Sequence, residues 1–462
     1  MGDREEPYLI RITNDKESNK KQPKKRNGFT VLTGAESKED PILSDEEDDK
    51  EDMSSLYEED DAKEELPADN VIRLKQHSGK VYVIIAIIVA AVLLVGGYFY
   101  GNRTRTSYVV DSKVNRNDET AMEYFSFHGG YIKYNEDGIT YEDKTGTIVW
   151  TEAFTMTDPK VVSCGDYVAV TDIGNNSYTL YNTSKKLGSF QTDYPITDIQ
   201  VATQGLVAVV LEDEKTNFIT AFDRMGTKCV EIKTTISKNG YPFAIALSED
   251  GQKLVASYVT IDHTTVESSL TFYNFGDVGK NEVDRQVGYK KFSDQLFPSV
   301  EFLSNDTVSA IGDSRMVIYS MRQKPKELLN KKIKDEIKSV FYNSSYVGYI
   351  CRSNKKSKTV ETSEVSENTD HVTDDDARYV LKAYNLKGKQ TLKKDINFHY
   401  TNVHSNEREI IVLSDQHCEV VSYSGFERFQ MDTEDLVDFF PSNRNNHYVM
   451  ITRDATKMIH TK

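Results

Sequence analysis

The sequence predicts an all-β fold, an eight-bladed β-propeller, that follows a single transmembrane helix and a disordered N-terminal tail. Two observations predict it. Residues 81–100 form an apolar run without a charged side chain, and the long remainder consists of short strands in a recurring pattern. Repeats of about 40 to 50 residues that contain only short strands are typical of propeller blades. We therefore expect a tail at 1–80, a helix at 81–100 and a propeller at 101–462.

The tail is strongly acidic. The chain has a formal net charge of -16, and about half of this excess falls within residues 1–80. A segment with so many like charges buries too little apolar surface to offset the entropy lost on folding, so we expect disorder. Its apolar island, PYLIRI at residues 7–12, is either a docking motif for a cytoplasmic partner or a stray patch in a solvated tail, and we favour the stray patch.

The apolar run VYVIIAIIVAAVLLVGGYFY, residues 81–100, has the length of a membrane span. At a rise of 1.5 Å per residue, about 20 residues cross a hydrocarbon core of about 30 Å. Lys80 and Arg103 flank the run, and its last three residues are aromatic, which is typical of a membrane interface. A long polar segment precedes the run and no small-residue cleavage site follows it, so we expect an uncleaved signal-anchor.

The orientation of this span rests on the basic residues around it. The charges close to its two ends balance, and the basic block KKQPKKR at residues 20–26 then favours a cytoplasmic N-terminus. The expected location is the cell membrane, with a single pass and an extracytoplasmic C-terminal domain.

The repeating unit after the helix is a hairpin. Alternating apolar residues end in an aromatic residue, and a polar turn, often with glycine, leads into another short strand, as in ITYEDKTGTIVW around Tyr141. Further copies centre on Tyr181, Phe222, Tyr273, Tyr319, Tyr384 and Tyr423, and a weaker copy around Met458 closes the chain. These copies predict eight blades; seven is the alternative, because the first and last copies are the weakest.

The last copy ends at Lys462 directly after its third strand. We expect SYVVDSK, residues 107–113, to supply the missing fourth strand, which would close the ring and remove an exposed sheet edge. The long step between Tyr319 and Tyr384 is explained by an insertion at residues 354–378, which lacks apolar periodicity and is typical of a flexible loop.

Two segments carry a resemblance to known propellers. SEDGQKLVAS, residues 248–257, resembles the turn-strand signature of TolB-like and YVTN-type propellers, and ITYEDKTGTIVW resembles a quinoprotein-type (PQQ-like) blade. The layout of acidic tail, single span and tyrosine-rich propeller is similar to an uncharacterised family of Gram-positive bacteria, domain of unknown function 5711. This resemblance implies a fold and brings no activity with it.

Composition and cysteine spacing exclude several functions. The mildly acidic main domain argues against nucleic acid as a partner, because phosphate binding needs a basic face. Cys164, Cys229, Cys351 and Cys418 are far apart in sequence, so they form no CxxC metal or redox pair. We expect isolated buried thiols, and one disulfide bridge is the alternative.

The sequence contains no recognisable catalytic, cofactor-binding or metal-binding set. His399 and His404 are close in sequence, with His417 further on, but their spacing is not that of a zinc site. Glu212 and Glu214 lie in a polar turn, and no P-loop or nucleophile elbow is present. We therefore expect no catalytic residues, no cofactor, no metal ligands and no enzyme.

The expected function is a non-enzymatic, membrane-anchored extracytoplasmic propeller that binds or scaffolds an envelope protein or glycan. One alternative is a single-pass transducer that couples an external ligand to a cytoplasmic partner of the tail. The other is an envelope glycan hydrolase or lyase, which would place a buried carboxylate or histidine cluster at the centre of the ring.

Overall fold

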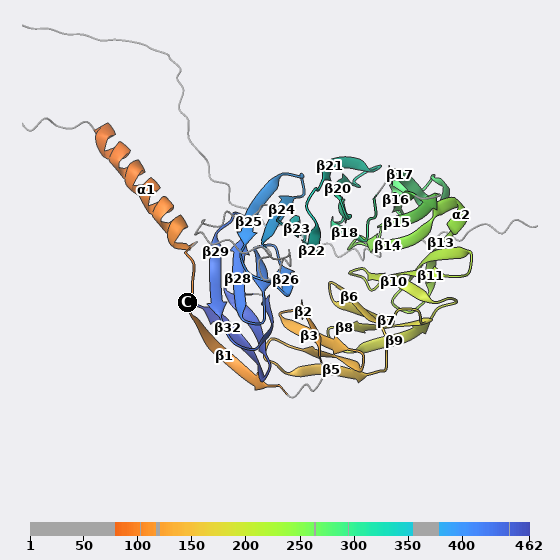
Figure 1. Ribbon diagram of the computed structural model, residues 1–462, viewed down its shortest axis with the longest axis horizontal. Helices are drawn as coiled ribbons and strands as arrows, with labels where there is room; N and C mark the ends of the chain where they lie inside the picture. Colours follow the sequence, from red (N-terminus) through yellow and green to blue (C-terminus); the bar gives the residue numbers. More distant parts are fainter. Residues whose placement is uncertain are drawn as a thin grey trace, which may run out of the picture. The chain divides into compact units, whose positions relative to one another are not determined.

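The computed structural model describes residues 79–101, 103–116, 121–262, 265–293, 295–353, 378–442 and 444–462. Over these residues it contains one long apolar helix and eight four-stranded antiparallel sheets arranged as a ring (Figure 1). The eight-bladed propeller is therefore confirmed over the seven-bladed alternative. Residues 1–78, which include most of the predicted tail, and residues 354–377 of the predicted loop at 354–378 lie outside the described residues.

Helix α1 spans Gly79–Gly101. Its apolar side chains are exposed along its whole described length, so burial inside the protein does not account for its composition. The segment Tyr82–Gly101 is long and apolar enough to cross a membrane, by length and composition.

Each of the first seven blades takes four consecutive strands, ordered from the ring centre outward. Blades 1 to 4 are β2 (Glu123–Phe127), β3 (Gly130–Asn135), β4 (Gly138–Glu142) and β5 (Ile148–Ala153); β6 (Pro159–Cys164), β7 (Tyr167–Asp172), β8 (Ser177–Asn182) and β9 (Lys186–Gln191); β10 (Ile196–Val201), β11 (Val207–Glu212), β12 (Thr216–Phe222) and β13 (Lys228–Thr235); and β14 (Tyr241–Leu247), β15 (Lys253–Asp262), β16 (Thr265–Asn274) and β17 (Gln286–Ser293).

Blades 5 to 7 follow the same order, and blade 8 takes its outer strand from the start of the domain. They are β18 (Ser299–Ser304), β19 (Thr307–Ile311), β20 (Arg315–Ser320) and β21 (Lys326–Lys332); β22 (Ile337–Tyr342), β23 (Tyr346–Arg352), β24 (Tyr379–Asn385) and β25 (Gln390–Ile396); β26 (Asn402–Ser405), β27 (Glu409–Leu413), β28 (His417–Ser422) and β29 (Glu427–Asp432); and β30 (Leu436–Pro441), β31 (His447–Thr452), β32 (Ala455–Thr461) and β1 (Tyr108–Asn115). Short helices α2 (Ile236–Asn239), η1 (Asp277–Gly279) and η2 (Val283–Arg285) lie between strands of blades 3 and 4.

The ring closes as the sequence predicts. Strand β1 pairs antiparallel with β32, from Tyr108 opposite Thr461 to Asn115 opposite Ala455. Before it enters blade 8, the chain is also fixed to blade 7, because the amide of Arg105 donates to the carbonyl oxygen of Arg428. The first and last described parts of the domain therefore share one sheet, and β1 covers the outer edge of β32 that would otherwise be unpaired.

The repeated aromatic residues of the first seven blades are buried and lie at the end of the third strand or directly after it, whereas Met458 in the third strand of blade 8 is only partly buried. Apolar clusters fill the space between neighbouring blades, and one of them stacks Trp150 of blade 1 on Tyr181 of blade 2 with ring centroids 4.6 Å apart. The indole N–H donates to the carbonyl oxygen of Asn182. Aromatic side chains with a polar group at the ring edge suit this position, because they bury a large apolar area and their N–H or O–H group can still form a hydrogen bond.

The hairpin turns use asparagine and aspartate for a local reason. The Oδ1 atoms of Asn135, Asn182 and Asp223 each accept backbone N–H groups two to four residues further on. Such side-chain acceptors replace missing backbone partners and stabilise a tight turn. Glycine completes some turns: Gly226 has a φ of 80°, and a Cβ there would lie 2.2 Å from the ring of Phe190.

Candidate functional site

An open cleft of about 590 Å³ lies on one face of the ring, where the inner strands turn into the second strands. It is lined by side chains of blades 1, 6, 7 and 8, namely Phe125, Ser126, Asn343, His404, Ser405, Asn406, Glu407, Arg408, Phe440, Pro441 and Ser442. Aromatic, amide and charged groups thus converge from four blades, which is the mixture usual in binding sites.

Two amide side chains hold the turns of blades 6 and 7 together at this cleft. Asn343 Oδ1 accepts the backbone N–H groups of its own turn, and its Nδ2 donates to the carbonyl oxygen of Asn406 at 2.7 Å and to Oη of Tyr423 at 2.6 Å. Asn406 Oδ1 in turn accepts the N–H groups of Arg408 and Glu409. These contacts fix the shape of the cleft wall before any ligand is bound.

Arg408 links blade 7 to blade 8 in the same way. Its guanidinium donates to the carbonyl oxygen of Ser442 at 3.2 Å and to the side-chain oxygen of Asn445. Because these acceptors hold its guanidinium in place, Arg408 contributes charge and rigidity to the wall. The neighbouring Glu407 is exposed and accepts a hydrogen bond from Ser344 at 3.2 Å.

The inner strands supply a second polar pair at the cleft. His404 Nε2 lies 2.6 Å from Asp438 Oδ1, which also accepts the backbone N–H of Phe439 at 2.7 Å. The His404 ring meets the edge of Phe440, with centroids 5.8 Å apart. The pair therefore links the inner strands of blades 7 and 8 and places an imidazole beside an aromatic surface.

A different polar cluster lies at the centre of the ring. Asp198 is buried on β10; its Oδ1 accepts from Lys160 Nζ at 2.6 Å and from the Ile199 N–H at 2.7 Å, and its Oδ2 accepts the Ile245 N–H at 2.8 Å. One carboxylate therefore links the inner strands of blades 2, 3 and 4. Buried carboxylates are tolerated when their oxygens are satisfied in this way.

Glu301 joins this cluster from β18 of blade 5. Burial, and then the negative charge of Asp198, raise the pKa of Glu301 to about 8, although a hydrogen bond from Tyr342 and the charge of Lys160 act in the opposite direction. The Glu301 charge, and then burial, raise the pKa of Tyr342. Because blades 2 and 3 are not neighbours of blade 5, these groups meet at the ring centre. A carboxyl that keeps its proton near neutral pH is able to act as an acid.

The three histidines that the sequence singled out do not come together among the described residues. His404 pairs with Asp438, His417 Nδ1 lies 2.6 Å from Asp432, and the His399 ring contacts the edge of Tyr379. Each has its own local contact, so no joint site arises from them.

The other residues considered from sequence also lie apart. Glu212 ends β11 and accepts a hydrogen bond from Tyr241, and Glu214 is exposed in the following turn. All four cysteines are free; Cys351 and Cys418 are buried as expected, whereas Cys164 and Cys229 are only partly buried.

Sequence reasoning missed the groups that the fold assembles. Lys160, Asp198 and Glu301 each sit in a short alternating strand that reads as ordinary sheet. A further group, Asp111 with His447 and His460, joins the start of the domain to its end. The sequence did contain one signal. Asp198 and Asp438 each occupy the third position of an inner strand, and each accepts a hydrogen bond from the backbone N–H of the residue that follows it.

The sequence profile of a protein family described as "Family of unknown function (DUF5711)" matches residues 101–461. No curated protein matches the chain in sequence.

Several solved structures are similar to this chain at low identity. BamB from Moraxella catarrhalis is 11% identical, with 77% of this chain and 100% of that chain covered and a TM-score of 0.43. Dipeptidyl peptidase 4 from Porphyromonas gingivalis is 14% identical, with 74% and 59% covered and a TM-score of 0.44. The Pan2 WD40 domain from Neurospora crassa is 10% identical, with 66% and 88% covered and a TM-score of 0.38. Likenesses at these identities and TM-scores assign no role to the chain.

Proposed function

The chain belongs to the DUF5711 family, a family of unknown function, and we propose that it is a membrane-anchored binding or scaffolding module of the cell envelope. In this proposal α1 spans the cell membrane, the tail lies in the cytoplasm and the propeller lies outside. The length and composition of α1 support the anchor, and the basic block at residues 20–26 supports the orientation.

The observation that carries the binding role is the cleft between the turns of blades 6, 7, 8 and 1. Its walls are held by hydrogen bonds of Asn343, Asn406 and Arg408, so little conformational entropy is lost when a partner binds. Partly exposed Phe125 offers apolar surface, and exposed Glu407 offers an acceptor. This combination suits an extended segment of another envelope protein, with backbone groups for the polar wall and side chains for the aromatic surface.

Site-specific photo-crosslinking in intact cells tests this role. A photoreactive amino acid replaces exposed Glu407 in the full-length chain, and a second sample carries it at Met225, an exposed turn residue of blade 3. We expect a protease-sensitive adduct at position 407 alone. Ser126→Trp, which fills the cleft from an exposed position, should remove the adduct, whereas Ser189→Trp, at an exposed position of β9, should keep it.

Equal adducts at positions 407 and 225, or an adduct that survives Ser126→Trp, would contradict binding in the cleft. An adduct that resists protease but yields to glycan-cleaving enzymes would assign the cleft to a glycan instead of a protein.

The envelope glycan hydrolase or lyase is the second candidate, because the cluster of Lys160, Asp198 and Glu301 is the buried carboxylate group that this alternative requires. Glu301, with its raised pKa, would donate the proton to the leaving group. The test incubates the full-length protein with isolated cell-wall glycan between pH 6 and 9 and follows released fragments. Release that Glu301→Gln abolishes supports the enzyme, and the absence of release at every pH rejects it.

A further inference from the structure

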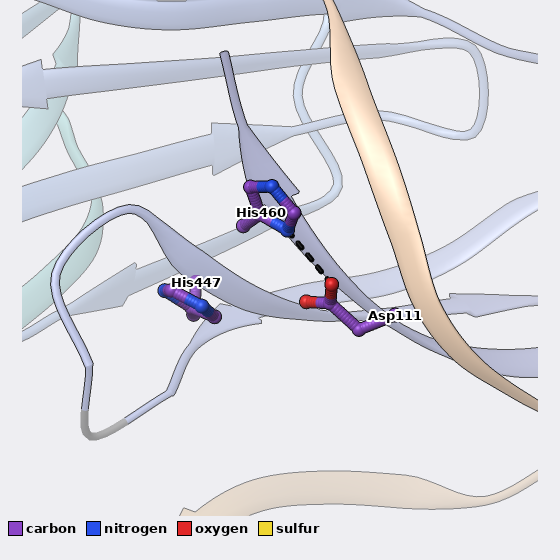
Figure 2. A group of neighbouring side chains, drawn as sticks. All are labelled: Asp111, His447 and His460. Carbon is purple, nitrogen blue, oxygen red and sulfur yellow. Dashed lines mark hydrogen bonds and ion pairs between the residues drawn. The ribbon is translucent and has the colours of Figure 1, made fainter.

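Three side chains with metal-binding chemistry meet where the ring closes (Figure 2). Asp111 belongs to β1, His447 to the start of β31 and His460 to β32. His460 Nδ1 lies 2.8 Å from Asp111 Oδ1, and one ligand atom from each of the three residues lies within 4.8 Å of the others. This group shares no residue with the lining of the cleft or with the cluster at the ring centre.

The sheet itself brings these side chains together. His447 and His460 are directly opposite each other in the β31–β32 ladder, and their rings stack with centroids 5.4 Å apart. Asp111 is the extra residue of a β-bulge between Val110 and Ser112 in β1. A bulge redirects a side chain out of the regular alternation, and Figure 2 shows the Asp111 carboxylate directed towards His460, with His447 beside it.

A hydrogen bond orients His447 as a ligand. His447 Nδ1 lies 2.8 Å from the carbonyl oxygen of Asn445. Because a carbonyl oxygen only accepts, Nδ1 must carry the proton, and the neutral ring then presents the lone pair of Nε2. A hydrogen bond of this kind fixes the tautomer and orientation of metal-ligating histidines.

We propose that Asp111, His447 and His460 bind a divalent transition-metal ion, with Zn²⁺ as the best match, and that this ion fastens the ring closure. Two imidazoles and one carboxylate are a known zinc set that leaves a fourth position for water. Donors on a tetrahedral zinc ion lie about 3.4 Å apart, given bonds of about 2.0–2.1 Å. Small side-chain rotations reach this spacing from the present one, and all three residues are at least partly exposed, so the ion can enter from solvent.

The consequence is mechanical. The ion would link β1 to both β31 and β32, and so join the strand that follows α1 to the last two strands of the chain. A ligand that binds only the folded protein shifts the unfolding equilibrium towards the folded state. This inference does not depend on the proposed binding function.

The experiment uses the full-length protein in detergent, stripped with a chelator and titrated with Zn²⁺ by calorimetry and thermal unfolding. We expect one equivalent of Zn²⁺ and, at about 100 times the Kd, a rise in Tm of about 3 °C. Mg²⁺ should leave the Tm unchanged, since hard cations prefer oxygen ligands. Co²⁺ should give the visible absorption of a tetrahedral site with nitrogen ligands.

The variants separate this site from adventitious binding. His447→Ala and His460→Ala should each lower Zn²⁺ affinity at least 100-fold and remove the rise in Tm. His417→Ala is the matched control, because His417 also pairs with an exposed aspartate on a strand, Asp432. Equal Zn²⁺ binding after loss of both His447 and His460, or binding without a rise in Tm, would overturn the proposal. If the metal-free variants have the same Tm as the metal-free wild type, misfolding does not cause their loss of Zn²⁺ binding. The Co²⁺ spectrum of the wild type tests the site without any variant.

Discussion

Tyr108 and Thr461 lie opposite each other in one antiparallel ladder, so the strand that follows α1 and the last strand of the chain belong to the same blade. The Tyr108 ring also meets the edge of Phe429 in blade 7, with centroids 6.5 Å apart. Both ends of the described domain are thus held by neighbouring blades. The stability of the whole ring should therefore depend on this one seam, since opening it exposes sheet edges on both sides.

Ile459→Ala tests the seam. Ile459 is fully buried in β32, and its removal leaves a cavity, so we expect a loss of about 3 kcal/mol in the free energy of unfolding. Val110→Ala is the control, because Val110 is paired with Ile459 across the ladder but is 44% exposed. Urea denaturation measures the free energy of unfolding of both variants. Equal losses for the two variants would show that burial at the seam does not determine stability.

Asp198→Ala should destabilise the ring from its centre. The substitution leaves the N–H groups of the buried residues Ile199 and Ile245 without their acceptor and Lys160 without its partner. Because Lys160 is partly exposed, water can solvate its ammonium group after the carboxylate is removed. We therefore expect the free energy of unfolding to fall by about 3 kcal/mol, the lower end of the range for breaking a buried ion pair. Asp193→Ala, at an exposed position just before β10, should change the urea midpoint very little; a comparable loss there would contradict the assignment.

The blades were predictable because their signals are local. Each aromatic residue that ends a third strand and each turn asparagine or aspartate is read within a dozen residues, and the fold then confirms eight copies. The candidate sites were not predictable in the same way. Lys160, Asp198 and Glu301 come from three different blades, and Asp111 meets His460 from the opposite end of the domain. Only the closure of the ring brings such residues together.

Asn343→Ala should loosen the cleft more than it destabilises the fold. It removes the acceptor within the blade 6 turn and two donors to blade 7, so the turns around residues 343 and 406 should exchange amide hydrogen faster. Asn385→Ala removes the same kind of turn acceptor, for the N–H groups of Lys387 and Lys389, without a contact to the cleft. We expect each variant to lower the free energy of unfolding by about 1 to 2 kcal/mol. Only Asn343→Ala should also weaken the photo-crosslinked adduct at position 407. Equal exchange around residue 406 in both variants would argue against the linked turns.

Thiol labelling tests the proposed topology. In a background that carries Cys164→Ser and Cys229→Ser, a cysteine replaces Met225, which is 74% exposed on the propeller, or Ser44 in the tail. A membrane-impermeant maleimide should label position 225 in intact cells and position 44 only after lysis. The reverse pattern would place the propeller in the cytoplasm.

Glu301 should make stability depend on pH. The pKa of this carboxyl is about 8 in the folded protein, against an ordinary value of 4.5. Below pH 4.5 the group is protonated in both states, and between pH 4.5 and 8 only the folded state keeps the proton. The folded state therefore loses stability as pH rises through this window, and the loss is complete above it. Because Glu301 is partly exposed, we expect a loss of about 2 kcal/mol, less than its pKa shift alone implies.

Glu301→Gln removes this titration while keeping the size of the side chain. The variant should match the wild type at pH 5 and exceed its stability at pH 9, with urea midpoints compared at pH 5, 7 and 9. Glu249→Gln, at an exposed turn position of blade 4, should keep the wild-type pH dependence. If Glu301→Gln keeps it as well, another group causes the slope, and the proton on Glu301 is then not available for the acid role in the second candidate function.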